Sequence, residues 1–168
     1  MKERIPSRVN YNLKTKRGVE KFMQDFLDEL GLHNWKFRWS RGKKTLGHCN
    51  LTRGEIRLSA FAHKHLSEEH IYNTLVHEVA HALTPGARHG PTWKSMMRRL
   101  GQNPNTTYRM KGMNDEFIAA TEKQYKWAIE CPTCKTTIAR YMRKPGKKFQ
   151  RGQKKHITCG TVVTFRRI

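Results

Sequence analysis

Two histidines and a glutamate lie close together in the stretch LVHEVAHALTPGARHGPTW, residues 75–93. His77 and His81 are four residues apart, so on a helix they lie about 6 Å apart along the axis and share one face. Two imidazoles at this spacing can bind one metal ion. Glu78 lies beside that face, where its carboxylate can take a proton from a metal-bound water. The spacing therefore predicts a metal-dependent hydrolytic site with Glu78 as the general base.

A catalytic zinc ion needs a third protein ligand and an open position for water. The sequence has no Asp or Glu between Val79 and Asn114, which excludes a carboxylate ligand from the following helix. The imidazole available downstream is that of His89, just beyond the Thr-Pro-Gly break at residues 84–86. A chain reversal at this break would return His89 to the end of the first helix. The predicted catalytic zinc ligands are therefore His77, His81 and His89.

A second set of candidate ligands lies in the C-terminal part of the chain, as a C-x-x-C pair followed by an H-x-x-C pair. This spacing favours metal binding over a disulfide framework and is typical of a closed, structural zinc site. A segment this polar has little other means of folding. The predicted structural zinc ligands are Cys131, Cys134, His156 and Cys159. No role is assigned to the remaining candidates Cys49, His63, His65 and His70.

The basic charge of the chain is uneven. The 168 residues carry a net charge of +21, and from Cys131 to Ile168 there are 11 Lys or Arg and no Asp or Glu. Such an asymmetry favours a polyanionic partner, and nucleic acid in particular, over a merely solvated surface. Charge alone does not separate DNA from RNA. The predicted nucleic-acid contacts are Lys135, Arg140, Arg143, Lys144, Lys147, Lys148, Arg151, Lys154 and Lys155.

The candidate residues are expected to be positioned by an α+β fold. Apolar periodicity predicts helices at 18–30, 67–83, 91–100 and 114–124, and alternation predicts strands at 35–40, 45–51 and 54–60. The three strands are expected to form a small antiparallel meander. Strands are also predicted from 125 into the C-x-x-C pair and over 156–168. We expect a metal-binding domain over residues 1–124 and a small basic β domain over residues 125–168.

The order of these features resembles that of the SprT-like (Spartan) metallopeptidase family. The resemblance rests on the strand EIRLS, on HEVAH, and on HGPTWKSMM, which opens a second helix after the break. It extends to the C-terminal ligand pairs, where the family's ribbon usually has a cysteine in the position of His156. The resemblance implies a zincin-like domain followed by a zinc ribbon, with one catalytic and one structural zinc ion.

The resemblance also implies a function, namely zinc-dependent cleavage of proteins that are bound or crosslinked to DNA, as in DNA repair. DNA and its attached proteins would then be the partners, with an extended substrate segment pairing with the edge of the 54–60 strand. Two alternatives remain open. One is a nucleic-acid-binding zinc protein whose HExxH domain is silent, and the other is a metal-dependent nuclease, which the lack of carboxylate ligands disfavours.

The sequence gives no sign of membrane association. No apolar run approaches the length of a membrane span, and the first residues, MKERIPSRVNYNLK, contain no apolar signal-peptide core. We therefore expect an intracellular protein, in the cytoplasm, on the nucleoid or, in a eukaryote, in the nucleus. We also expect a monomer.

Overall fold

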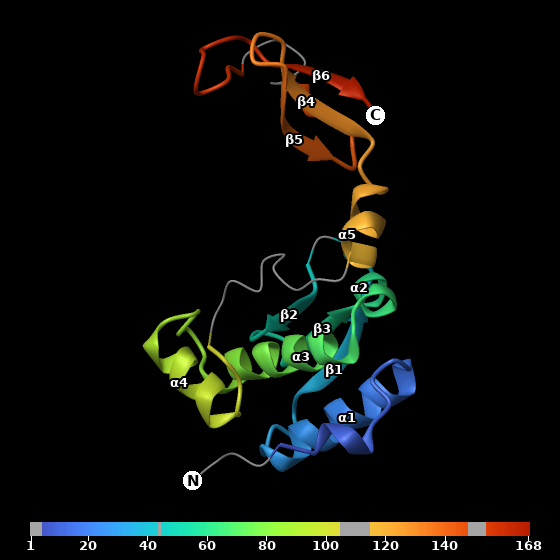
Figure 1. Cartoon of the computed structure of the whole chain (residues 1–168). Helices are drawn as coiled ribbons and strands as arrows, with labels where there is room; N and C mark the ends of the chain where they lie inside the picture. The colour runs from blue at the N-terminus through green and yellow to red at the C-terminus, as the bar shows by residue number, and fades with distance from the viewer. Residues whose placement is uncertain (1–4, 44, 105–114, 148–153) are drawn as a thin grey trace. The chain divides into compact units, whose positions relative to one another are not determined.

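The computed structural model describes residues 5–43, 45–104, 115–147 and 154–168. The chain divides into two units, residues 1–118 and 119–168, and each is described here by itself (Figure 1). The division falls within helix α5 (Asp115–Glu122), a few residues before the boundary expected from the sequence.

The first unit begins with a short 3-10 helix η1 (Arg8–Asn10) and the amphipathic helix α1 (Lys16–Glu29). Thr15 caps α1, because its side chain accepts a hydrogen bond from the backbone N–H of Gly18. The apolar positions that predicted this helix are buried on one face, namely Val19, Phe22, Met23, Phe26 and Leu27. A helix was therefore correctly predicted here.

Three strands form the sheet of the first unit: β1 (Lys36–Ser40), β2 (Gly47–Asn50) and β3 (Glu55–Ser59). Their order is β1-β3-β2; β1 pairs parallel with β3, and β2 pairs antiparallel with β3. The predicted antiparallel meander is therefore wrong, although its three strands exist. The chain leaves β1, reaches the far edge at β2, and returns through a hairpin into the central position.

Burial explains why β3 takes the centre of the sheet. Ile56 and Leu58 on β3 have no exposed surface, and Ser59 at its end is also buried. A central strand shields its backbone groups on both edges, which suits the most buried of the three segments. Helix α2 (Ala60–His65), which was not predicted, follows at once because the Ser59 side chain accepts from the N–H of Ala62.

Helix α3 (Glu68–Leu83) packs against β2 and β3, and α4 (Pro91–Arg99) packs against α3 (Figure 1). Ser67 caps α3, and Pro91 occupies the first turn of α4, so both helices begin close to the residues predicted for them. The core of the unit lies between α1, the sheet and α3. It includes Phe22, Phe26, Leu58, Leu75 and Trp93.

The second unit contains an antiparallel sheet of order β5-β4-β6, from β4 (Trp127–Cys131), β5 (Thr136–Tyr141) and β6 (Thr164–Arg167). β5 was not predicted, because its side chains are mostly exposed and polar and show no apolar alternation. The predicted strand over 156–168 is regular only in β6. Among the described residues, no helix is long and apolar enough to cross a membrane.

Candidate metal centres

Helix α3 has an apolar face and, on another side, a face that carries histidines. Its first turn carries Glu68 and Glu69, whose negative charges interact favourably with the positive end of the helix dipole. The side chain of Ser67 accepts a hydrogen bond from the backbone N–H of His70. Ile71, Leu75 and Val79 are fully buried against the core. His77 and His81, one turn apart, therefore lie away from this apolar face, with both side chains partly accessible.

The chain reverses after α3 at two positions with positive φ. Gly86 has φ 79° and Arg88 has φ 48°, both in the left-handed region that glycine adopts most easily. The buried Thr84 ends the helix, donating its hydroxyl to the carbonyl of Ala80 at 2.7 Å. This reversal returns the chain to α3 and delivers His89 beside the two helix histidines.

The three imidazoles converge on one point. The Nε2 atom of His89 lies 3.1 Å from Nε2 of His77 and 3.1 Å from Nε2 of His81. Two nitrogens bound to one tetrahedral zinc ion lie roughly 3.3 Å apart, given bond lengths of about 2.0–2.1 Å. The donor atoms thus fit one shared metal ion of the size of zinc. The structure brings together all three histidines that the sequence singled out.

The buried indole of Trp93 contacts all three imidazoles. Its ring centroid lies 4.8 Å from His77, 5.4 Å from His81 and 4.7 Å from His89. Trp93 has no exposed surface and lies on α4, four residues after His89. The indole therefore limits the rotation of each imidazole. The sequence analysis did not single out this residue.

Burial keeps two of the imidazoles neutral. It lowers the pKa of His77 from 6.5 to about 4, with a further contribution from the neighbouring rings of His81 and His89. Burial and the neighbouring His89 likewise lower the pKa of His81 to about 4. A neutral imidazole is the form that binds a metal ion. At neutral pH both rings are therefore ready to bind.

Glu78 is buried next to the histidine cluster. Burial raises the pKa of its carboxyl group from 4.5 to about 7, although a hydrogen bond from the backbone N–H of Cys49 lowers it in part. A carboxyl group with a pKa near neutrality exchanges protons readily in both directions. Strand β2 thus orients the side chain through its backbone, which residue types alone did not reveal.

Gly47 on β2 makes room for Glu78. A Cβ atom at position 47 would lie 2.7 Å from Cγ and 2.8 Å from Oε1 of Glu78, and 2.9 Å from Cγ2 of Thr74. No side chain fits at these distances without displacing the strand or the carboxylate. Position 47 therefore requires glycine because of a close approach, a requirement that sequence analysis did not detect.

Two clefts meet beside Glu78. One, of about 540 Å³, is lined by residues that include Tyr72, Asn73 and Met97, and the other, of about 490 Å³, by His48, Cys49, His81 and His89. Gly47, His77 and Glu78 line both. An extended ligand that occupied both clefts would cross directly beside the carboxylate and the imidazoles.

The second predicted cluster also comes together, in the second unit. Sγ of Cys131 lies 3.4 Å from Sγ of Cys159, and Nδ1 of His156 lies 3.5 Å from Sγ of Cys134 and 3.4 Å from Sγ of Cys159. The four donor atoms can hold one metal ion. The residues that follow the two ligand pairs, Lys135 and Gly160, both have positive φ, so the two turns resemble each other. His156 thus lies where it could serve as the fourth ligand.

The predicted nucleic-acid contacts are exposed where the structure describes them. This holds for Lys135, Arg140, Arg143, Lys144, Lys147, Lys154 and Lys155. Lys148 and Arg151 lie outside the described residues. Arg140 pairs with Glu122, and Lys144 lies over the rings of Trp127 and Phe165.

The residues left without a role are not among the donors of the histidine cluster. His63 is buried, with Nε2 2.9 Å from the carbonyl oxygen of Leu13 and its ring against Trp39. His65 packs on Phe61, and Nδ1 of His70 lies 2.6 Å from Oγ of Ser67. Cys49 is half-buried, and burial together with Glu78 raises the pKa of its thiol to about 11. These three histidines thus make packing and capping contacts, whereas Cys49 lines the cleft that contains His81 and His89.

The first unit is thus a mixed α+β domain in which a cluster of three histidines that could hold a metal ion lies beside a buried carboxylate. The model of the SprT-like family matches residues 15–112, which include this whole cluster. The chain therefore belongs to the SprT-like family, and this family is linked to a metallopeptidase-like fold. No curated protein matches the chain, and no solved structure does. The cysteine-containing cluster lies outside the matched residues.

The lowered pKa values predict how metal binding at the histidine cluster depends on pH. Protons compete with a metal ion only below the pKa that each imidazole has in the metal-free protein. Competition from His77 and His81 should therefore begin near pH 4 and not near pH 6.5. The affinity for Co²⁺ should fall by at most about one decade per pH unit between pH 6.5 and 5, against about three for three ordinary histidines.

Absorption spectroscopy can measure this dependence. The d–d bands of Co²⁺ bound by imidazoles are distinguishable from the thiolate charge-transfer bands of Co²⁺ in the cysteine-containing cluster. A loss that approaches three decades per pH unit as the pH falls toward 5 would show that the histidines are not held neutral by burial.

Proposed function

We propose that the protein is a zinc-dependent endopeptidase that cleaves proteins bound or crosslinked to DNA. The observation that carries the proposal is the convergence of three imidazole nitrogens beside the buried Glu78, where two clefts meet. Family membership supports the same activity.

His77, His81 and His89 would hold the catalytic zinc ion and leave an open position. A bound zinc ion supplies Lewis acidity toward a water molecule and the scissile carbonyl. Glu78 takes the proton from the attacking water and later donates it to the leaving amine. Its pKa of about 7 suits both transfers, because neither protonation state is strongly favoured at neutral pH. Trp93 keeps the three imidazoles in place.

The substrate would bind along β2, not along the strand proposed from the sequence. The 54–60 segment forms β3, whose two edges are already paired with β1 and β2. In the sheet as described, β2 has one unpaired edge, and its residue Gly47 lines both clefts. An extended peptide can add to such an edge through backbone hydrogen bonds. This arrangement would carry the scissile bond past Glu78.

The second unit would recruit the enzyme to DNA. It has a small sheet and a Cys₃His cluster, which fit a zinc ribbon with one structural zinc ion. The described basic residues between the ligand pairs are exposed, and the segment from Cys131 onward contains no acidic residue. Neutralisation of phosphates by such side chains supplies sequence-independent affinity.

The alternative from another class is a non-catalytic zinc protein that binds nucleic acid through the second unit. The excess of basic residues there supports binding in either case. The buried Glu78 favours the enzyme, because burying a carboxyl group is unfavourable and a structural site needs no base. A nuclease is disfavoured, since the histidine cluster contains no carboxylate ligand for a two-metal arrangement.

Replacing the general base tests the activity directly. Glu78→Gln should lower kcat for cleavage of a DNA-bound protein by about 10²–10⁴-fold, because proton transfer is lost. Zinc content should not change, since Glu78 is not a predicted ligand. The matched control is Glu29→Gln on the exposed surface of α1, which should keep wild-type activity. Equal cleavage by the wild type and Glu78→Gln, or no cleavage by either, would contradict the proposal.

Closing the space at Gly47 tests the positioning of Glu78. Gly47→Ala should lower kcat at least about tenfold, because the added methyl group displaces the carboxylate or the substrate-binding strand. The matched control is Gly42→Ala, where the nearest heavy atom would be 3.5 Å from the new Cβ. Zinc content measured on both variants separates loss of positioning from loss of metal. Wild-type turnover by Gly47→Ala would show that the close approach has no catalytic role.

A further inference from the structure

The sheet of the first unit has two unlike faces. Phe37 and Ile56 share the inner face with Cys49, and Trp39 and Leu58 share it with Gly47, as the strand register shows. This face packs on α1 and α3: the indole N–H of Trp39 donates to Glu20 of α1, and Gly47 approaches Glu78 of α3. The alternate residues of each strand must therefore lie on the outer face.

The outer face is cationic and contains no apolar side chain. In the strand register, Arg38, Arg57 and His48 form one row across the sheet, and Lys36, Glu55 and Asn50 form the next. Neighbouring members of a row lie about 5 Å apart, the spacing of paired strands. Lys36, Arg38 and His48 are exposed, and the side chain of Arg57 is 31% exposed.

The single carboxylate of this face is already neutralised. Glu55 accepts two hydrogen bonds from Arg57, one from Nε at 3.0 Å and one from Nη2. The bond with Arg57 holds the pKa of Glu55 below its usual range, and the charges of Arg53 and Arg38 lower it further. Three guanidinium groups thus act on one carboxylate, and the face keeps a positive excess.

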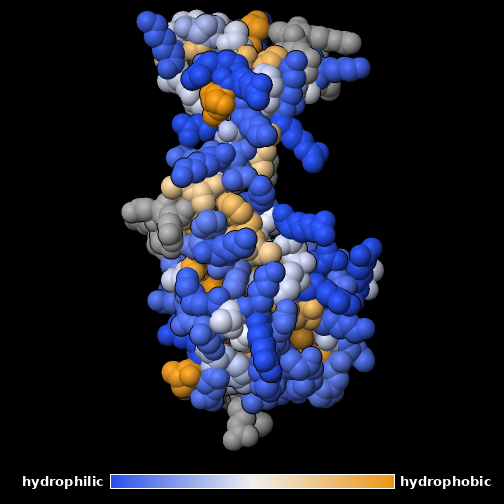
Figure 2. All heavy atoms as spheres, turned by 90° about the vertical axis from the view of Figure 1, so that its right-hand side faces the viewer, coloured by the Kyte–Doolittle hydropathy of each residue, from blue (hydrophilic) through white to orange (hydrophobic). Residues whose placement is uncertain are grey.

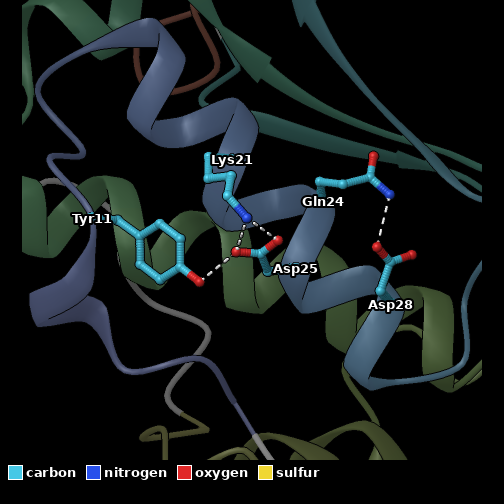
Figure 3. Close-up of polar contacts among 5 residues, drawn as sticks. All are labelled: Tyr11, Lys21, Gln24, Asp25 and Asp28. Atoms are coloured by element: carbon cyan, nitrogen blue, oxygen red, sulfur yellow. Dashed lines mark hydrogen bonds and ion pairs between the residues drawn. The ribbon is translucent and has the colours of Figure 1, made fainter.

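Helix α1 of the same unit does not share this positive excess. Helix α1 carries four acidic residues, Glu20, Asp25, Asp28 and Glu29. Figure 3 shows how two of them are engaged: Asp25 accepts from Tyr11 and Lys21, and Asp28 accepts from Gln24. Basic and acidic groups therefore balance on α1 and do not balance on the outer face of the sheet.

We propose that the outer face of the β1-β3-β2 sheet binds the phosphate backbone of nucleic acid. The partner follows from the chemistry of the face, because arginine binds phosphate oxygens through two parallel N–H groups. A protein partner would need an apolar or aromatic centre in its interface, which the described residues of this face do not provide. Hydrophilic residues also dominate the view of the molecule in Figure 2.

Nucleic acid bound to the outer face would lie close to the histidine cluster. His48 lies on the outer face and also lines the cleft of about 490 Å³ that contains His81 and His89. A nucleic-acid strand on this face would therefore run beside the β2 rim of the cleft, where a protein attached to that strand would be close to the imidazoles. This inference goes beyond the proposed function, because it places nucleic acid on the first unit and needs no proteolysis.

The test compares charge removal on two surfaces of the same unit. The variant Arg38→Gln/Arg57→Gln removes two charges from the outer face, and the matched control Lys94→Gln/Arg98→Gln removes two exposed charges from α4. Affinity for labelled single-stranded and duplex oligonucleotides is measured by fluorescence anisotropy over a range of salt concentrations, with the full zinc-loaded chain.

The outer-face variant should bind more weakly, and the slope of log affinity against log salt should become shallower by about 1.4 for single strands or about 1.8 for duplex. The control should leave the slope unchanged. Arg38→Lys/Arg57→Lys, which keeps both charges, should restore the slope and verify that the sheet tolerates substitution. Equal slopes for the outer-face variant and the control would overturn the proposal.

Discussion

The close approach of strand β2 to helix α3 organises the candidate active site. At Gly47 the strand comes so near the helix that no side chain fits between its backbone and Glu78. The same contact allows the N–H of Cys49 to reach the carboxylate, and it removes that carboxylate from water, so its pKa rises to about 7. This packing contact therefore holds Glu78, the candidate base, beside strand β2.

The opposite side of the cluster depends on Trp93. The indole is fully buried and contacts the rings of His77, His81 and His89, so the convergence of the nitrogens does not rely on a metal ion alone. Burial also lowers the pKa of two of these rings, which prepares them to bind a cation in a chain with a net charge of +21. Packing therefore contributes to the assembly of the three-histidine cluster.

Residue spacing was enough to predict the local parts of the structure. The Ser67 cap, the four-residue interval between His77 and His81, and the Pro-Gly break are local signals, and α3, the turn and His89 follow from them. Sheet order is a long-range property, and no local signal showed that β3 would enter between β1 and β2. The roles of Gly47 and Trp93 were missed for the same reason, since both depend on contacts between separate elements.

The central claim is that His77, His81 and His89 bind one zinc ion beside Glu78. A crystal structure of the zinc-loaded protein with anomalous diffraction data at the zinc edge tests it most directly. We predict one anomalous peak bounded by the three Nε2 atoms, with Glu78 beside the metal but not bound to it, and a second peak at the cysteine-containing cluster. Absence of the first peak, or a Glu78 carboxylate bound directly to the metal, would contradict the account.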